Sequence, residues 1–317
     1  MTHSANIRQK ISLLLFFATL GLNSQVYEKS IVLHGDTITF PITLINGYPF
    51  VSATVNGTAG KFMFDTGFGT SVMLNDDFIQ LPLKKPKGNG VVGSGQSFRT
   101  NMNDNISEIT FSNGISYKKL TSIISGNYGF IQNVLTPDFL GFIGYDFFKE
   151  YIFKIDYLHH KITFYKNAGE TRISGDILKN EKILAVLTFE IRNRPNIPIV
   201  KFKIKGVDVM GVFDTGQNGS LQLDTESAQM LTQENIVTKS GIDSNGDTLL
   251  NITNIEICDK LTITLKGIEY AELNSTKVAR RELGISEPNL MSIGYRFLAQ
   301  HKTVWDYAQK KIYILEY

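Results

Sequence analysis

The tripeptide Asp-Thr-Gly occurs twice in this chain, as Asp65-Thr66-Gly67 and as Asp214-Thr215-Gly216, and each copy follows a phenylalanine. A single Asp-Thr-Gly is most simply a turn. Two copies in one shared context predict that Asp65 and Asp214 meet across a pseudo-two-fold axis. Two neighbouring carboxylates cannot easily both ionise, so they share one proton. Such a pair can activate a water as general base and polarise a carbonyl as general acid.

Both tripeptides belong to a longer internal repeat. Identical residues recur at a separation of 149 positions around the tripeptides and at 150 positions towards the end of each copy. The matched pairs include Thr39/Thr188, Phe40/Phe189, Ile42/Ile191, Pro49/Pro198, Val51/Val200, Gly57/Gly206, Ser71/Ser220, Leu74/Leu223, Gly144/Gly294, Tyr145/Tyr295, Asp156/Asp306, Tyr157/Tyr307 and Lys161/Lys311. The chain is therefore predicted to be a duplication of a unit of roughly 130 residues, a size that one compact domain can hold.

These motifs resemble those of the aspartic peptidase clan that includes the retropepsins and the pepsins, and most of all its bacterial retropepsin-like members with both halves in one chain. In that clan an apolar-apolar-Gly segment lies beneath each Asp-Thr-Gly loop. The matching segments here are Phe142-Ile143-Gly144 and Ser292-Ile293-Gly294, the second departing from the pattern at Ser292. The resemblance covers residues 38 to 317. It implies an all-β, bilobal acid-protease fold, in which two pseudo-two-fold-related β-barrel-like lobes carry a few short helices.

The resemblance also assigns roles within the two loops. It implies that Asp65 and Asp214 are the catalytic pair, supported by Thr66, Gly67, Thr215 and Gly216. The glycines let the backbone turn tightly beside the carboxylates, and the threonine hydroxyls can donate across the axis to the opposite loop. Pepsin-like enzymes often have Ser or Thr directly after the tripeptide, where the hydroxyl lowers the pKa of the ionised Asp. This chain has Phe68 and Gln217 there.

Glycine-rich stretches follow each loop at 88–95 and at 241–246. The first contains a literal Gly-x-Gly-x-x-Gly, but it lacks the preceding strand and following helix of a dinucleotide site. In the clan a β-hairpin flap closes over the cleft, so both stretches are flap candidates, with ordinary exposed hairpins as the alternative. The candidate flap residues are Gly93, Ser94, Gly95, Asn245 and Gly246.

Alternating strand patterns dominate the chain. Residues 51–55 alternate and meet the hairpin signal Asn56-Gly57, and residues 201–205 occupy the same place in the second copy before Gly206. Four short helical segments are expected, at 75–81, 145–150, 224–231 and 295–300.

Composition limits the other possibilities. The chain has 317 residues, of which 42% are hydrophobic and 20% charged, and its formal net charge is +2. Such a charge predicts no nucleic-acid partner. No His or Cys lies at ligand spacing, so we expect no metal and no cofactor. The single cysteine, Cys258, lies in a strand-like apolar run and is expected to be buried. Asp156 and Asp306 are expected to cap turns rather than enter the cleft.

The N-terminus reads as a secretory signal over residues 1–24, with a charged start, an apolar stretch from Ile11 to Leu22 and a small residue before the cut. Twelve apolar residues are few for a membrane span, and an uncleaved interfacial anchor is the alternative. Export to the periplasm or the outside is therefore expected, without stable membrane insertion. The predicted domains are an N-terminal lobe at 25–166, a linker at 167–179 and a C-terminal lobe at 180–317.

The sequence favours an aspartic endopeptidase that acts as a monomer with pseudo-dimeric lobes on an extended peptide or protein substrate. A silent clan member that binds peptides or a protein partner in the same cleft is the main alternative, because neither tripeptide is followed by a hydroxyl residue. A β-rich structural protein of the envelope is a third possibility, but it would not require paired Asp-Thr-Gly loops.

Overall fold

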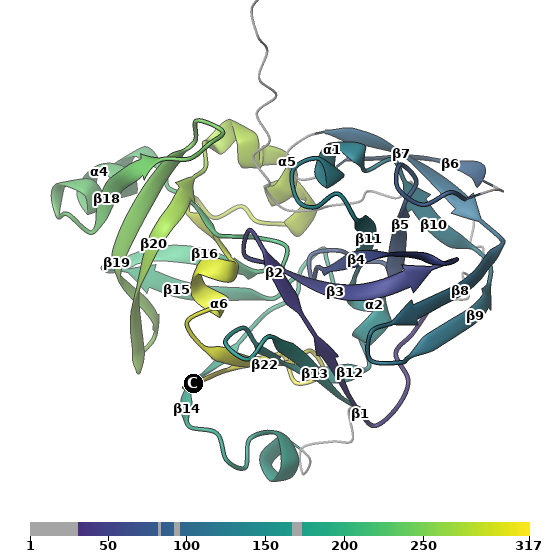
Figure 1. Ribbon diagram of the computed structural model, residues 1–317. Helices are drawn as coiled ribbons and strands as arrows, with labels where there is room; N and C mark the ends of the chain where they lie inside the picture. The colour runs from purple at the N-terminus through teal and green to yellow at the C-terminus, as the bar shows by residue number, and fades with distance from the viewer. Residues whose placement is uncertain (1–30, 82–83, 92–95, 167–172) are drawn as a thin grey trace, which may run out of the picture.

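The computed structural model describes residues 31–81, 84–91, 96–166 and 173–317, and about half of them lie in the strands of three β-sheets. One sheet belongs to the N-terminal half, one to the C-terminal half, and the third lies between them (Figure 1). The prediction of an all-β, two-lobed fold is confirmed. The predicted signal at 1–24 falls outside the described residues, and export stays a prediction. Among the described helices, none is long and apolar enough to cross a membrane.

The sheet of the N-terminal half has ten strands in the order β6-β7-β10-β5-β11-β4-β3-β8-β9, with β2 paired to β3. Its strands are β2 Thr43–Ile45, β3 Tyr48–Val55, β4 Thr58–Phe64, β5 Val72–Asn75, β6 Lys84–Val91, β7 Ser97–Asn103, β8 Ile106–Phe111, β9 Ser116–Leu120, β10 Ile123–Gly126 and β11 Phe139–Ile143.

The sheet of the C-terminal half has the order β18-β19-β20-β17-β21-β16-β15. Its strands are β15 Ile199–Ile204, β16 Val207–Phe213, β17 Ser220–Gln222, β18 Val237–Ile242, β19 Thr248–Cys258, β20 Leu261–Tyr270 and β21 Leu290–Ile293. This order repeats β6-β7-β10-β5-β11-β4-β3 strand for strand. A pairing of β15 with β19 closes six of the strands into a ring, and β3 pairs with β8 in the equivalent way. The duplication read from the sequence thus has a counterpart in the topology.

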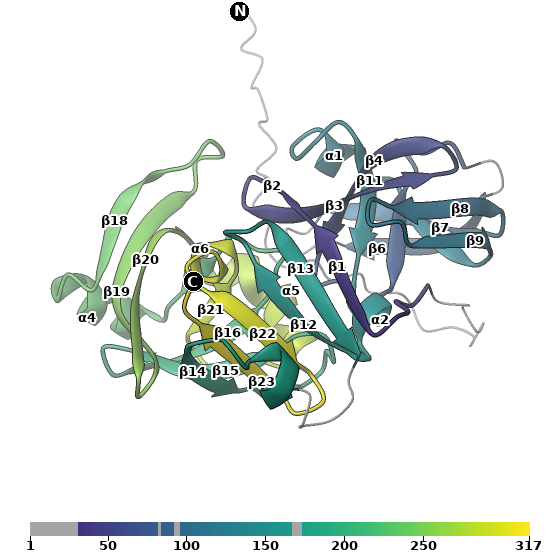
Figure 2. The same cartoon turned by 60° about the horizontal axis from the view of Figure 1, so that its bottom comes forward.

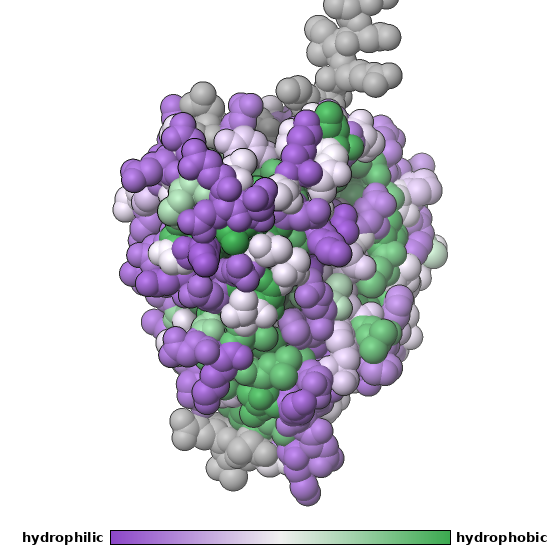
Figure 3. Space-filling view, turned by 90° about the vertical axis from the view of Figure 1, so that its left-hand side faces the viewer, coloured by the Kyte–Doolittle hydropathy of each residue, from purple (hydrophilic) through white to green (hydrophobic). Residues whose placement is uncertain are grey.

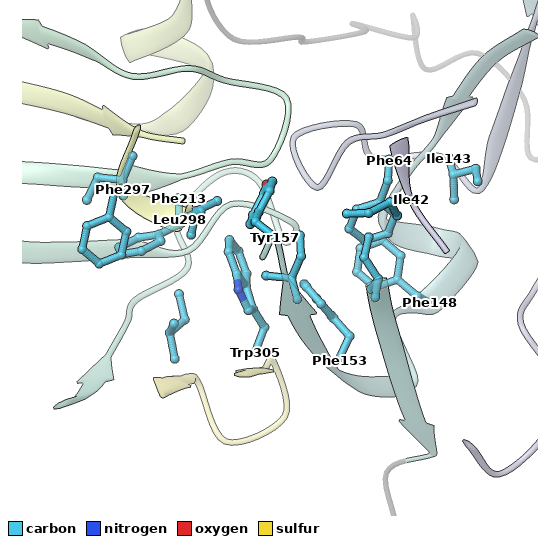
Figure 4. Close-up of a cluster of buried hydrophobic side chains, with 14 of the residues drawn as sticks. Ile42, Phe64, Ile143, Phe148, Phe153, Tyr157, Phe213, Phe297, Leu298 and Trp305 are labelled. Carbon is cyan, nitrogen blue, oxygen red and sulfur yellow. The ribbon is translucent and has the colours of Figure 1, made fainter. Parts of the chain in front are cut away.

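A six-stranded sheet joins the halves and takes three strands from each (Figure 2). The strand patterns of the sequence do not predict this sheet. Its order is β1-β13-β12-β22-β23-β14, with bounds β1 Thr37–Pro41, β13 Lys161–Lys166, β12 Tyr151–Asp156, β22 Lys302–Asp306, β23 Lys311–Leu315 and β14 Ile183–Thr188. At its centre β12 pairs with β22, which places Phe153 opposite Trp305. Their rings stack with centroids 5.3 Å apart, between side chains of the two halves (Figure 4). One hydrophobic core therefore runs through both lobes.

The predicted hairpin turns occur at equivalent places. Asn56 and Gly57 join β3 to β4, and Lys205 and Gly206 join β15 to β16. All four residues have positive φ, between 49° and 85°. Two consecutive residues of positive φ are what a two-residue type I′ turn requires, and its twist matches that of the strands it connects.

Within the described ranges the helices are α1 Gly129–Gln132, α2 Tyr145–Phe148, α4 Thr225–Gln233, α5 Leu273–Leu283, α6 Tyr295–Leu298 and a five-residue helical turn, η1 Ile173–Ile177. The expected helices near 145, 224 and 295 are present. Asp224 caps α4 by accepting the Ser227 N–H at 2.8 Å. The turn η1 falls in the predicted linker, and buried Ile173 and Ile177 pack there against the central sheet.

The helix predicted at 75–81 is wrong, since these residues form the end of β5 and a turn. Asn75 is completely buried, and its side chain accepts the N–H groups of Asp77 at 3.1 Å and Tyr128 at 3.2 Å. Its amide group also donates to the carbonyl of Phe139 at 2.9 Å. The side chain at the start of the predicted helix instead ties three segments of the lobe together.

On the side of the C-terminal half, hydrophilic side chains cover most of the surface and apolar ones gather in separate patches (Figure 3). Such a mixed surface is ordinary for a globular protein.

Candidate active site

Each Asp-Thr-Gly loop begins where a buried strand ends. The first loop follows β4 and the second follows β16, and their last residues, Phe64 and Phe213, are buried in the core. The Asp65 N–H donates to the carbonyl of Ile143 at 2.9 Å, and the Asp214 N–H donates to that of Ile293 at 3.1 Å. The apolar-apolar-Gly segments therefore hold both loops in the same way.

The glycines that end these segments, Gly144 and Gly294, allow a close approach. A Cβ atom at Gly144 would lie 2.3 Å from the carbonyl oxygen of Phe68, and one at Gly294 would lie 1.9 Å from that of Gln217. Each carbonyl instead accepts the N–H of the residue that follows the glycine. Tyr145 donates to the carbonyl of Phe68 at 2.7 Å, and Tyr295 donates to that of Gln217 at 2.8 Å. Any larger residue at these two positions would push the Asp loops out of place.

The two threonines exchange hydrogen bonds across the axis. The Thr66 N–H donates to Oγ1 of Thr215 at 3.0 Å, and the Thr215 N–H donates to Oγ1 of Thr66 at the same distance. The Thr215 hydroxyl in turn donates to the carbonyl of Phe64 at 2.9 Å. Both threonines are completely buried, and such satisfied buried bonds fix one relative position of the two loops.

The loops bring Asp65 and Asp214 together. The Gly67 N–H donates to Oδ1 of Asp65 at 2.8 Å and also to Oδ1 of Asp214 at 3.0 Å. The Gly216 N–H donates to Oδ1 of Asp214 at 2.8 Å. One peptide N–H thus bridges the two carboxyl groups.

Gly67 and Gly216 each lie against the carboxyl group of the opposite loop. A Cβ atom at Gly67 would lie 2.4 Å from Oδ2 of Asp214, and one at Gly216 would lie 2.5 Å from Cγ of Asp65. Side-chain atoms do not approach that closely. The sequence predicts glycine here for a tight turn, and the structure adds that the pair leaves no room for a side chain.

Burial governs the ionisation of the pair, because neither aspartate side chain is exposed. Burial raises the pKa of Asp65 well above its ordinary value, and the nearby charge of Asp214 raises it further. Burial also raises the pKa of Asp214, while the N–H groups of Gly216 and Gly67 act in the opposite direction. The two carboxyl groups therefore titrate as one coupled pair that shares a proton.

The chain was compared with protein families, with curated proteins and with solved structures. No family model matches it, and no curated protein matches it either. Among solved structures, it is similar to basic 7S globulin from soybean. That similarity has a TM-score of 0.49 at 10% sequence identity, and it covers 88% of this chain and 95% of the globulin chain.

Phe68 and Gln217, the residues directly after the tripeptides, are both buried. Neither has a hydroxyl group that could donate to the aspartates. The ring of Phe68 stacks on that of Phe142, with centroids 5.0 Å apart and planes inclined by 18°. Within the described residues, Oδ2 of Asp65 and Oδ2 of Asp214 have no hydrogen-bond partner. No side-chain hydroxyl therefore assists either outer oxygen.

The flap candidates belong to two segments of the chain, of which the structure describes one. Asn245 and Gly246 lie in the turn between β18 and β19, where Oδ1 of Asp243 accepts the N–H groups of Asn245 at 2.8 Å and Asp247 at 2.9 Å. Gly93, Ser94 and Gly95 lie outside the described residues, although the strands on either side of them, β6 and β7, pair as an antiparallel hairpin.

A cavity of about 340 Å³ lies between the halves beside the Asp214 loop. Its lining comes from the turn before β3, the loop after α1, the Asp214 loop, the β18–β19 turn and β20. The lining residues are Asn46, Tyr48, Val134, Leu135, Gln217, Asn218, Gly219, Asp243, Ser244, Asn245 and Glu269. A candidate flap turn and a candidate catalytic loop thus face the same cavity.

Sequence reasoning missed two buried residues beside the pair, Tyr48 and Asn196. Burial, and then the charges of Glu269 and both aspartates, raise the pKa of Tyr48, and its hydroxyl accepts the Asn218 side-chain N–H at 3.3 Å. Asn196 donates to the backbone of the Asp65 loop. In the other copy of the repeat, Ile197 stands in place of Tyr48 and Gly47 stands in place of Asn196. A search for identical residues in the two copies therefore identifies neither of them.

The remaining candidates are structural. Oδ1 of Asp156 accepts the His159 N–H at 2.9 Å and Oδ1 of Asp306 accepts the Gln309 N–H at 3.0 Å, so both cap turns as predicted. Cys258 is only half-buried at the end of β19, where it packs against the core rather than inside it. Within the described residues, no group of three or more His, Cys, Asp or Glu side chains could hold a metal ion.

Proposed function

We propose that this chain is an aspartic endopeptidase of the retropepsin-like and pepsin-like clan. The observation that carries the proposal is the meeting of Asp65 and Asp214, which lie on equivalent loops and share the Gly67 N–H. Two buried carboxyl groups with unequal environments are what water activation between a base and an acid requires.

In the proposed reaction Asp214 acts as the base and Asp65 as the acid. The ionised Asp214 takes a proton from a water, whose oxygen forms a bond to the carbonyl carbon of the peptide. Asp65 gives its proton to the carbonyl oxygen, which yields a tetrahedral diol. The C–N bond then breaks while the nitrogen takes the proton from Asp214, and one hydroxyl proton of the diol returns to Asp65. The pair ends in its starting state.

The proposed substrate is an extended peptide or a protein segment lying between the halves. The cavity beside the Asp214 loop and the β18–β19 turn supports this, because residues of both halves line it. The central sheet joins the halves within one chain, so the proposed active unit is a monomer. Export belongs to the same proposal and rests on residues 1–24.

Cleavage of a diverse peptide library across the pH range tests the function. We expect cuts at internal bonds that pepstatin suppresses, read by mass spectrometry of the products. Peptides that bind to the protein but are not cut at any pH would instead favour a silent peptide-binding protein. The absence of a hydroxyl residue after each tripeptide supports that alternative.

The same library is expected to show a preference for lysine or arginine at one position. Asp243 and Glu269 give the cavity two carboxylates, and no lysine or arginine is among its described lining residues. A charge-assisted hydrogen bond contributes about 1.5–3 kcal/mol, so Glu269→Gln should lower kcat/KM for basic peptides about tenfold and leave neutral peptides unchanged. Glu256→Gln, on the exposed face of β19, is the control. An equal loss for basic and neutral peptides would contradict the preference.

A further inference from the structure

Asn196 lies in the loop between β14 and β15 of the C-terminal half, yet it binds the Asp65 loop of the N-terminal half. Its side chain is 3% exposed. The amide nitrogen donates to the carbonyl of Thr66 at 2.9 Å and to the carbonyl of Gly67 at 2.8 Å. Both hydrogens of this amide are therefore used on one short stretch of backbone.

The first of these bonds acts on the peptide unit that bridges the pair. The carbonyl of Thr66 and the N–H of Gly67 belong to the same planar unit, and in a trans peptide they point in opposite directions. Asn196 holds the carbonyl end of that unit. The N–H end donates to Oδ1 of Asp65 and to Oδ1 of Asp214. Fixing one end of a rigid plane fixes the other, and a bonded carbonyl also makes its N–H a better donor.

The loop that carries Asn196 is itself fastened to its own half. Arg192 binds the carboxylate of Glu287 through two nitrogens, at 2.6 and 2.8 Å, and Arg194 binds Glu282 at 2.6 Å. The Tyr307 hydroxyl donates to the carbonyl of Asn196 at 3.0 Å. An arginine–carboxylate pair with two hydrogen bonds fixes the orientation of both groups and also stabilises their contact. These contacts therefore hold the loop, and with it the Asn196 amide, in one position.

The Asp214 loop has no such support, because the equivalent position in the first copy is Gly47. A Cβ atom at Gly47 would lie 2.6 Å from Oδ1 of Asn218 and from the ring of Tyr295. The side chains of Asn218 and Tyr295 therefore leave no room there for the side-chain amide that the other half has. This is a clear break in the two-fold symmetry around the pair.

We infer that Asn196 is a positioning residue for the Asp65–Asp214 pair, which aims the Gly67 N–H between the two carboxyl groups. The inference rests on the proposed function for its catalytic meaning, but the arrangement of the pair can be measured without catalysis. Other titratable side chains near the pair are Tyr48, Tyr157 and Tyr307, and Glu269 lies near Tyr48. Burial raises the pKa of all three tyrosines, so they stay neutral where the aspartates titrate.

The test replaces Asn196 by aspartate, which keeps the shape and removes both donors, and by alanine. Asn193→Ala is the control, since Asn193 belongs to the same loop but donates to the Arg281 carbonyl at 3.2 Å, away from the pair. We expect kcat to fall about 10- to 100-fold in both Asn196 variants with little change in KM, since one hydrogen-bond network is lost at the acid–base step.

The pH profile should separate positioning from stability. A weaker Gly67 N–H bond favours the ionised carboxylates less, so both limbs of the profile should move to higher pH in the Asn196 variants and stay in place in Asn193→Ala. A loss of activity with unmoved limbs, matched by a lower Tm alone, would overturn the inference. If the wild type cleaves nothing, carbon-13 NMR titration of labelled aspartates still decides it, and an unchanged titration of the pair in Asn196→Ala, which adds no charge, refutes the positioning role.

Discussion

Changing either Asp65 or Asp214 to asparagine is expected to abolish peptide hydrolysis and leave the fold in place. The two carboxyl groups act as one unit around the shared Gly67 N–H, so losing either removes the shared proton and the base together. General acid–base catalysis contributes about 10²–10⁴-fold in rate. We therefore expect kcat/KM to fall by at least about 10³-fold in each variant, because both roles fail at once.

Stability gives an independent reading of the same variants. Burial raises the pKa of both aspartates, so the pair favours folding below the ordinary carboxyl pKa. That contribution is lost as the pH rises through the raised values. An asparagine cannot ionise, and the free energy of unfolding of each variant should depend less on pH than that of the wild type. Circular dichroism across pH measures this.

Asp208→Asn is the matched control. Asp208 lies on β16, the strand that leads to Asp214, and its side chain is 88% exposed. It should keep wild-type activity and wild-type stability. Full activity in Asp214→Asn would rule out the paired-carboxylate mechanism.

The repeat in the sequence predicts the parts of this molecule that obey the two-fold relation. The paired Asp-Thr-Gly loops, the turns at Asn56 and Lys205 and the turn caps at Asp156 and Asp306 all occur at equivalent places. Each follows from a local rule that holds in both copies: a positive φ, a side-chain cap, or a backbone that must approach closely. Local chemistry seen twice is a strong signal.

The unpredicted features depend on contacts between distant segments. The central sheet pairs β12 with β22, whose residues are some 150 positions apart in the chain, and strand patterns alone do not say which strands pair. Asn75 is of a type that often caps helices, and two aspartates follow it. Hydrogen bonds to distant segments nevertheless hold its side chain in the interior of the lobe. Asn196 breaks the repeat, and its role becomes visible only when the two halves are assembled.

The pH profile of hydrolysis is expected to be bell-shaped, with its alkaline limb above that of a relative with hydroxyl residues after both tripeptides. Activity should fall at low pH when both aspartates are protonated, and again at high pH when both are ionised. Burial raises the pKa of each aspartate, and Oδ2 of Asp65 has no donor among the described residues. Backbone N–H groups of the loops therefore oppose the effect of burial on the last ionisation, but no side-chain hydroxyl of the described site adds to them.

Phe68→Ser tests that cause directly. A hydroxyl that reaches Oδ2 of Asp65 would stabilise the ionised carboxylate and lower the pKa of the pair, so the alkaline limb should move towards acid. The substitution also removes the ring stacked on Phe142, at a cost of about 3–5 kcal/mol for a buried phenylalanine. Phe68→Ala leaves the same gap without a hydroxyl and serves as the control. A limb that moves in the serine variant alone assigns the effect to the hydrogen bond, whereas equal limbs in both variants would show that repacking, and not a missing donor, sets the ionisation of the pair.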